Sequence, residues 1–251
     1  MLNKFSKEYE INYYDVDYKL KCKLSSIVNF LCDVGNYHAE SLGETIESLV
    51  ENNCAWVFYK YDIKIKEYPK YRDTITVETE PIGFKKFYAY RSYYIKNSEG
   101  KLLGEAIALF FLINIEKRRP MRVLPEQYVR YGADGDLKKN IEMENILKLE
   151  KEDHYKDFNI RYSDIDSNGH VNNVKYIEWA IESVPVEVIK DYELKRIKVV
   201  FEKETTYGDT VHVSAQVIRN EENELVTIHT IKSEAGVELT KLEGKWVKEK
   251  E

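Results

Sequence analysis

The spacing of apolar residues along the chain predicts two long helices among many strands. Apolar residues recur at helical spacing over 24–42, which Gly43 ends, and over 172–183, which Pro185 follows. Runs with a period of two, or apolar throughout, predict strands. These runs are 8–14, 55–65, 73–80, 86–96, 102–115, 158–162, 194–202, 210–219, 225–233 and 240–248.

The order of these elements repeats within the chain. In each half a strand leads to an Asp-x-Asp turn, a long helix and further strands. The turns at Asp15 and Asp164 lie 149 residues apart (164 − 15), and the similar strands that begin at Asp73 and Asp209 lie 136 apart (209 − 73). Internal duplication is a strong sign of domain organisation. We therefore predict an α+β protein of two units side by side, each with one long helix and an antiparallel sheet.

The segment between the two halves is charged and irregular. We interpret residues 126–153 as a linker with a short helix at 140–149. At the start of the first long helix, Ser25 is the predicted N-cap because its hydroxyl can accept a backbone N–H.

Composition narrows the class of protein. The chain has 251 residues, 43% hydrophobic and 33% charged, which suits a globular protein with a substantial core. Its net charge of −6 does not favour a nucleic-acid partner, and no apolar run is long enough for a bilayer. The N-terminus has no apolar signal-peptide core, so we expect a cytoplasmic protein. Three cysteines without CxxC spacing argue against a disulfide framework or a zinc site.

A polar turn before the second helix holds the candidate chemistry. Asp166, Asn168 and His170 occupy alternate positions, so in an extended backbone their side chains would point the same way. The turn residues alone could be structural, because Asn-Gly is a common turn pair. Asp164 and Asp166 also fit the start of a calcium loop, but the closing carboxylate position is Lys175. We expect no metal there.

Comparison of the two halves shows where the unusual residues lie. The matched pairs are Asp17 with Asp166, Lys19 with Asn168, Lys21 with His170 and Tyr68 with Glu204. The carboxylate, amide and imidazole are together in the second copy only. No G-x-S-x-G, H-E-x-x-H or G-x-G-x-x-G motif is present. The remaining interpretation is acyl transfer to water, with a general base and a donor for an oxyanion.

A longer motif resembles a known family. It is Asp166-x-Asn168-x-His170-Val171-Asn172-Asn173-x-x-Tyr176-x-x-Trp179, accompanied in the first half by Trp56-Val57, Tyr68-Pro69-x-Tyr71-x-Asp73, Arg91 and Arg118-Arg119. In these residues the chain resembles the acyl-acyl carrier protein (acyl-ACP) thioesterases, the bacterial relatives of the plant enzymes. The resemblance implies two tandem hotdog domains. We expect an N-terminal domain at 1–130 with the acyl pocket, a linker at 131–152 and a catalytic domain at 153–251.

The resemblance also implies a site. Its catalytic residues would be Asp166, Asn168, His170 and Glu204. Glu204 would activate water directly or through His170, Asn168 would hold the nucleophile or the thioester carbonyl, and Asp166 would orient its neighbours. Plant members have a cysteine after this glutamate, whereas this chain has Thr205, so no cysteine nucleophile is expected. Glu204 could also be a solvated surface residue.

Six residues of the first half would bind substrate. The aromatic residues Trp56, Phe58, Phe84 and Phe87 would set the depth of the acyl pocket, although they could equally be ordinary core. Arg118 and Arg119 would contact the acidic carrier and its phosphopantetheine, unless they form a plain solvated turn.

The implied function is hydrolysis of fatty acyl-ACP to free fatty acid and ACP, in lipid metabolism, without a cofactor. The partner would be ACP with its phosphopantetheine-linked acyl chain, and neither nucleic acid nor a membrane is expected. A hotdog hydrolase of acyl-coenzyme A and a non-catalytic acyl-binding scaffold are the alternatives. The sequence leaves acyl chain length, saturation and a homodimeric state open.

Overall fold

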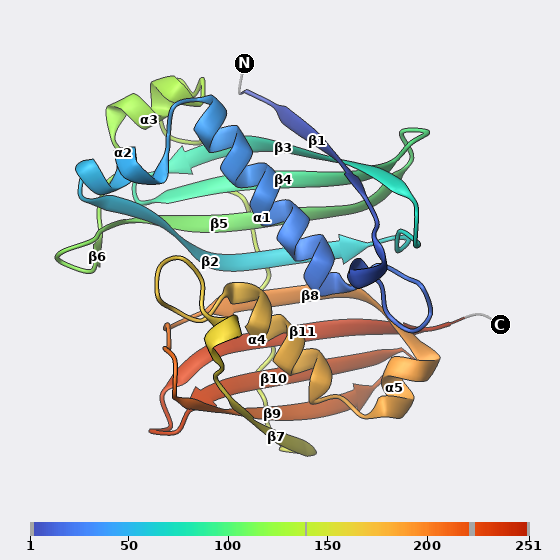
Figure 1. Cartoon of the computed structure of the whole chain (residues 1–251). Coiled ribbons are helices and arrows are strands. Elements are labelled where there is room, and N and C mark those ends of the chain that lie inside the picture. Colours follow the sequence, from blue (N-terminus) through green and yellow to red (C-terminus); the bar gives the residue numbers. More distant parts are fainter. Residues whose placement is uncertain (1–2, 139, 221–223, 250–251) are drawn as a thin grey trace. The chain divides into compact units, whose positions relative to one another are not determined.

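The two stretches with helical spacing form the longest helices of the described residues, α1 (Leu24–Ser41) and α4 (Asn173–Glu182). They belong to separate units of this computed structural model, which describes residues 3–138, 140–220 and 224–249. The first unit is Met1–Lys60 with Ile65–Met143, and the second is Tyr61–Lys64 with Glu144–Glu251. Each unit has one long helix and an antiparallel sheet, as predicted (Figure 1).

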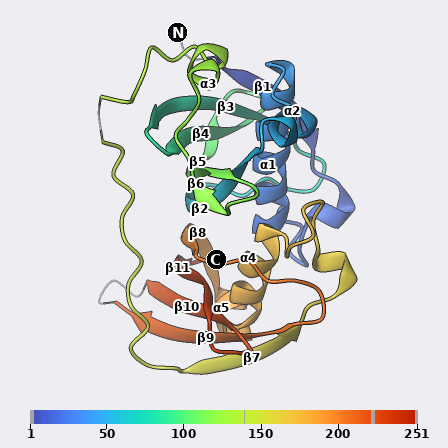
Figure 2. The same ribbon diagram turned by 90° about the vertical axis from the view of Figure 1, so that its left-hand side faces the viewer.

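In the first unit, α1 covers one face of the sheet (Figure 2). The strands follow the order β1-β3-β4-β5-β2, and the short β6 pairs with β5. α1 contacts β1 and β3, and its buried residues include Ile27, Leu31 and Val34. The elements are β1 (Phe5–Glu10), η1 (Tyr13–Asp15), α1, α2 (Ile46–Glu51), β2 (Cys54–Ile65), β3 (Thr74–Lys85), β4 (Tyr88–Asn97), β5 (Leu102–Asn114), β6 (Arg119–Pro120) and α3 (Pro125–Arg130).

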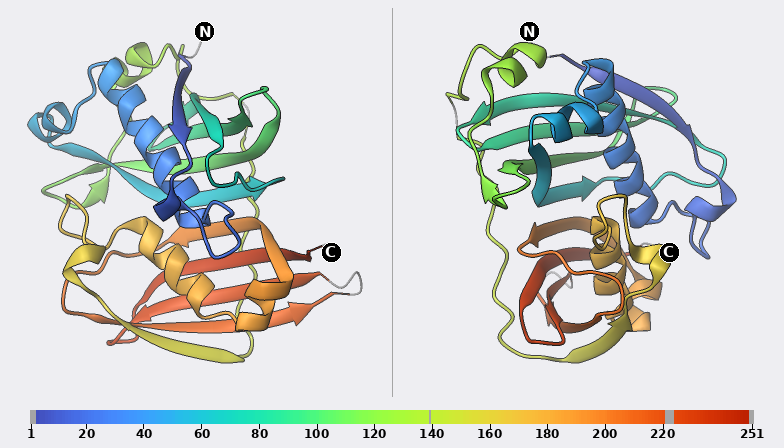
Figure 3. Two further views of the ribbon diagram at one scale, coloured as in Figure 1. Left: turned by 45° about the vertical axis from the view of Figure 1, so that its right-hand side comes forward. Right: turned by 60° about the vertical axis from the view of Figure 1, so that its left-hand side comes forward.

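The second unit repeats this plan with a shorter helix. Its strands follow the order β8-β11-β10-β9-β7, and α4 crosses one face of them (Figure 3). α4 contacts β9, β10 and β11, and its buried residues include Val174, Ile177 and Trp179. The elements are β7 (His154–Asn159), η2 (Tyr162–Asp164), α4, α5 (Val186–Asp191), β8 (Tyr192–Phe201), β9 (Thr210–Arg219), β10 (Leu225–Ser233) and β11 (Glu238–Lys248).

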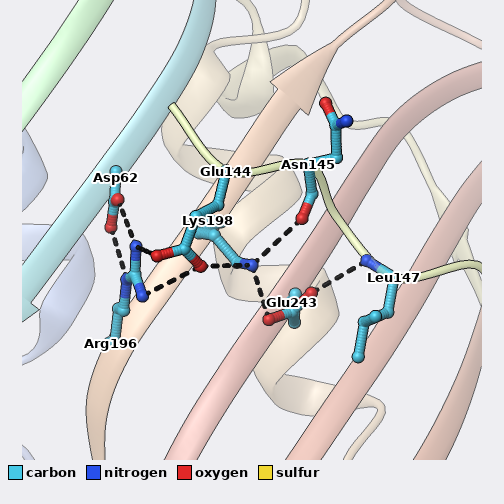
Figure 4. A network of polar contacts seen from close by, with 7 residues as sticks. All are labelled: Asp62, Glu144, Asn145, Leu147, Arg196, Lys198 and Glu243. Carbon is cyan, nitrogen blue, oxygen red and sulfur yellow. Dashed lines mark hydrogen bonds and ion pairs between the residues drawn. The ribbon is translucent and has the colours of Figure 1, made fainter. Parts of the chain in front are cut away.

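The predicted helix at 140–149 is wrong, because these residues have no regular secondary structure. Their backbone bonds to side chains of the sheet instead of to itself (Figure 4). The Leu147 N–H donates to Glu243 Oε2 (2.8 Å), and Lys198 Nζ donates to the Asn145 carbonyl (3.1 Å). These bonds satisfy polar groups that a helix would have satisfied internally.

An ion-pair network holds the same segment. Lys198, almost fully buried on β8, lies 2.7 Å from Glu243 and 3.4 Å from Glu144. Arg196 donates to both oxygens of Asp62 (2.8 and 2.6 Å) and of Glu144 (3.2 and 3.0 Å), as Figure 4 shows. Hydrogen bonds first to Asp62 and then to Glu144 outweigh burial and raise the pKa of Arg196.

Three local predictions are also corrected. Helix α3 occupies Pro125–Arg130, at the start of the segment 126–153 that we interpreted as irregular, and Pro125 at its first position fixes φ for the helix. The N-cap of α1 is Lys23, and Ser25 is buried within the helix. The strands predicted at 8–14 and 158–162 are β1 and β7, and both begin a few residues earlier than predicted. Both also end earlier, because a 3₁₀ turn follows each strand. Among the described residues, every helix is too short or too polar to span a membrane.

Candidate functional site

The polar turn before α4 is organised by one carboxylate. Asp166 Oδ1 accepts hydrogen bonds from the backbone N–H groups of Asn168 (2.8 Å) and His170 (3.4 Å). Its own N–H donates to the His170 carbonyl (2.8 Å). The predicted turn is therefore present and its backbone is not extended, because an aspartate captures nearby N–H groups and closes the turn. Gly169 lies in this turn with a φ of 79°, which suits a residue without a side chain.

A second aspartate fixes the start of the turn. The side chain of Asp164 is buried and accepts from the Arg161 backbone N–H (2.9 Å), Nε (3.1 Å) and a terminal guanidinium nitrogen (2.8 Å). Burial alone would raise the pKa of Asp164, but its hydrogen bonds from Arg161 outweigh burial and lower it. The Asp164 carbonyl also accepts from the Asn172 N–H (2.8 Å). Asn172 in turn caps α4 by accepting from the Val174 N–H (3.0 Å).

The loop after β8 brings Glu204 to this turn. The N–H of Val171 donates to the carbonyl of Thr205 (3.0 Å), so the residues next to His170 and Glu204 are joined. As a result His170 Nε2 lies 3.3 Å from Glu204 Oε1. The two side chains are 30% and 43% exposed, so water can reach both. An imidazole and a carboxylate in contact at a wet surface can take a proton from water.

The first copy has the same backbone frame with other side chains. Asp17 Oδ1 accepts from the N–H groups of Lys19 (2.8 Å) and Lys21 (3.0 Å). The N–H of Cys22 donates to the carbonyl of Pro69 (2.7 Å), as Val171 does to Thr205. The predicted correspondence between the copies is thus confirmed at both offsets. The first copy keeps the backbone frame and lacks the imidazole–carboxylate pair.

Sequence reasoning missed the groups that hold the Glu204 loop. Thr205 Oγ1 donates to Asp209 Oδ2 (2.6 Å), which ties this loop to the start of β9. The duplication could have indicated this, since Asp209 matches Asp73, whose carboxylate accepts the Lys70 N–H (2.8 Å). Nothing in the sequence pattern pointed to Arg161, because its role depends on the burial of Asp164.

Two of the four predicted pocket aromatics lie together in the first unit. The rings of Trp56 and Phe84 are 6.3 Å apart, and buried Phe84 packs with Val123 and Tyr131. Phe58 contacts Phe110 at 4.2 Å between ring centroids. Phe87 is half-buried in the turn between β3 and β4. Their role in binding an acyl chain stays a prediction.

A buried carboxylate lies beside the Trp56 ring. Glu44 is 2% exposed and accepts from the Trp56 indole N–H (3.2 Å), the Tyr131 hydroxyl (2.6 Å) and the Gln127 amide (3.1 Å). Three donors compensate for removing this charge from water. The polar group that fixes Trp56 could not be recognised from the sequence, where Glu44 follows the glycine that ends α1.

The predicted carrier-contacting arginines are on the surface. Arg118 and Arg119 are exposed where β5 turns into β6, and Arg122 is exposed just beyond it. Positively charged side chains at this turn would attract an acidic partner. The role of these arginines in binding the carrier stays a prediction.

Comparison with known proteins gives the family. Residues 2–131 match the family model of the acyl-ACP thioesterase N-terminal domain, and residues 147–248 match that of the C-terminal domain. The chain therefore belongs to the acyl-ACP thioesterase family, which confirms the resemblance found in the sequence.

Individual relatives agree with this assignment. The chain is 27% identical over 224 residues to oleoyl-acyl carrier protein thioesterase 1, chloroplastic, of Arabidopsis thaliana, covering 82% of this chain and 62% of the relative. It thus spans about three-fifths of that relative. A crystallised candidate oleoyl thioesterase from Lactobacillus plantarum superposes with a TM-score of 0.95 at 24% identity, covering 100% of this chain and 98% of the other. The 12:0-ACP thioesterase of Umbellularia californica superposes with a TM-score of 0.87 at 22% identity, covering 98% of this chain and 94% of the other. The tandem hotdog fold is confirmed.

Proposed function

We propose that this chain hydrolyses the thioester between a fatty acyl group and ACP, releasing free fatty acid and ACP. The observation that carries the proposal is the 3.3 Å contact between His170 and Glu204, built on a turn that Asp166 closes. The family assignment supports the reaction class and the carrier-linked substrate.

The chemistry follows from the position of each side chain. Glu204, directly or through His170, takes a proton from water while the water oxygen attacks the thioester carbonyl carbon. The amide of Asn168, exposed at the tip of the turn, donates to the nucleophile or to the carbonyl oxygen. When the carbon–sulfur bond breaks, the proton goes to the leaving thiolate. A general base contributes about 10²–10⁴-fold in rate and an oxyanion donor about 10²–10³-fold.

A water nucleophile fits the distribution of thiols. Thr205 stands next to Glu204, and all three cysteines lie in the first unit. Burial first, and then the negative charge of Asp15, raises the pKa of Cys22 to about 12. Burial likewise raises the pKa of Cys54. Neither thiol has the low pKa of a cysteine nucleophile.

The first unit would supply substrate contacts. The aromatic residues proposed for the acyl pocket are Trp56, Phe58, Phe84 and Phe87. Arg118 and Arg119 would meet the acidic carrier, so charge reversal at both should raise KM for acyl-ACP and leave kcat unchanged. A KM that does not change would remove these arginines from the contact.

The direct test is a panel of acyl-ACP substrates of varied chain length and saturation, with mass analysis of the released acids. We expect free fatty acid from acyl-ACP with a higher kcat/KM than from the matching acyl-coenzyme A. A reversed preference would favour the acyl-coenzyme A hydrolase. Tight acyl-ACP binding without any release would favour a scaffold.

A further inference from the structure

The buried carboxylate of Glu44 has no role in the chemistry above. Glu44 lies in the connection between α1 and α2. Its two oxygens accept three hydrogen bonds, from Trp56 on β2 and from Gln127 and Tyr131 in and directly after α3. The guanidinium of Arg130 lies 3.7 Å from the same carboxylate. Separate segments of the first unit are therefore held to one charged group.

Packing alone does not explain a carboxylate at this place. Burying a charge is costly, and a well-packed apolar group of similar volume is often as good for stability or better. The second unit has the apolar solution, because its connection between α4 and α5 is Ser183-Val184-Pro185 and Val184 is buried. The explanation for Glu44 therefore lies in what its carboxylate holds in place.

Trp56 is the substrate-binding candidate that this carboxylate contacts. The indole N–H donates to Glu44 Oε2 (3.2 Å), and the ring centroid lies 6.3 Å from that of buried Phe84. Trp56 itself is only half-buried, so part of its surface stays open to an apolar ligand. Phe58, two residues further along β2, lies on the same face of the strand. A tryptophan held by its polar edge presents its apolar surface in one fixed orientation.

We propose that Glu44 is a positioning residue that sets the selectivity for acyl chain length. Its carboxylate fixes the Trp56 indole, and the fixed ring limits how far an acyl chain enters the first unit. Glu44 acts through Trp56 and does not touch substrate. The inference rests on the proposed function, because it concerns an aromatic residue of the proposed acyl pocket. Without the carboxylate the ring can change rotamer, and longer chains then fit as well.

The test compares Glu44→Met with Tyr128→Phe, a matched change in the same cluster. Methionine has a similar length, and its thioether is a far weaker acceptor than a carboxylate. The Tyr128 ring packs on Phe84 and its hydroxyl donates to Asp136, so the control removes a hydrogen bond without changing those of Glu44. The measurement is kcat/KM for a series of acyl-ACP substrates that differ by two carbons.

The quantity compared is the preference for the best chain over a chain two carbons longer. In Glu44→Met we expect this ratio of kcat/KM values to fall about tenfold, because a hydrophobic pocket rejects one extra methylene by about 10–200-fold and a ring free to turn loses that rejection. Tyr128→Phe should keep the wild-type ratio. Since the ratio compares two substrates of one enzyme, a general loss of active protein cancels from it.

The indole N–H signals in NMR spectra of isotope-labelled protein report the contact itself. The chain has three tryptophans, and Trp56→Phe identifies the signal of Trp56. Its proton should move upfield in Glu44→Met, which lacks the charged acceptor, and stay in place in Tyr128→Phe. Glu44→Gln offers a weaker acceptor of the same shape and serves the same comparison where Glu44→Met does not fold.

Three results would overturn the inference. One is a Glu44 variant that shifts the Trp56 signal and keeps the wild-type ratio. Another is an unshifted Trp56 signal in the Glu44 variants, because the carboxylate would then not hold the ring. The third is an equal fall of the ratio in Tyr128→Phe. A wild-type protein that releases no fatty acid from any acyl-ACP would instead overturn the proposed function.

Discussion

The strongest prediction compares the two aspartates that close equivalent turns. Asp166→Ala removes the acceptor of the Asn168 and His170 N–H groups, and Asp17→Ala removes the acceptor of two N–H groups at the same place in the first copy. Both changes break the same kind of turn. Only the first disturbs a turn that holds the proposed catalytic side chains.

The expected magnitudes follow from this geometry. A hydrogen bond to a charged group contributes about 1.5–3 kcal/mol. Both carboxylates are partly exposed, and the contact to His170 is long at 3.4 Å. We therefore expect each substitution to lower the free energy of unfolding by about 1–2 kcal/mol. A shift of about 1 Å at the site costs about 10²-fold in rate, so kcat should fall about 100-fold in Asp166→Ala alone.

The assay measures release of fatty acid at saturating acyl-ACP, together with urea unfolding of each variant. Asp17→Ala should keep kcat within about threefold of wild type. A threefold change in kcat corresponds to about 0.6 kcal/mol in the activation free energy. The reasoning fails if Asp166→Ala keeps its rate. It also fails if the two variants lose kcat to the same extent, because stability would then explain both.

Three further predictions concern other parts of the molecule. Iodoacetamide at neutral pH should leave activity intact, because all three cysteines lie in the first unit whereas His170 and Glu204 lie in the second, and burial raises the pKa of Cys22 to about 12; rapid stoichiometric inactivation would contradict this. Lys198→Met strands the Glu243 carboxylate and should lower the free energy of unfolding by about 3 kcal/mol, whereas adding Glu243→Leu should restore most of it, as denaturant titration would show. Burial, and then the positive charge of Arg91, lowers the pKa of His38 to about 4, so the neutral ring is favoured in the folded state. Stability should therefore fall by up to roughly 3 kcal/mol as pH drops from about 6.5 to 4, and a His38→Phe variant with the same slope would refute this.

Much of the fold follows from local pattern. The strands predicted at 210–219 and 225–233 have the bounds that the structure shows, and over residues 210–215 every second residue is buried, as the alternating sequence indicates. The helix over 24–42 ends one residue earlier than predicted. The duplication also aligns Glu204 of the second copy with Tyr68 of the first. The equivalent backbone bonds to the carbonyls of Thr205 and Pro69 confirm that alignment.

Long-range polar contacts explain what the pattern could not predict. The residues 140–149 have a helix-compatible composition, yet Glu243 and Lys198 on the sheet bind their backbone groups. In the polar turn before α4, alternate positions would share one face of an extended backbone, but Asp166 bends the backbone by accepting its N–H groups. Such contacts depend on residues far away in sequence or on a local side chain that competes with regular structure.

The central claim is that Glu204 activates water beside His170. The most direct measurement is the single-turnover rate of acyl-ACP hydrolysis by Glu204→Gln, with Glu202→Gln, an exposed glutamate two residues earlier, as the control. The account predicts a fall of about 10²–10⁴-fold for Glu204→Gln and none for Glu202→Gln. A wild-type rate in Glu204→Gln would contradict it.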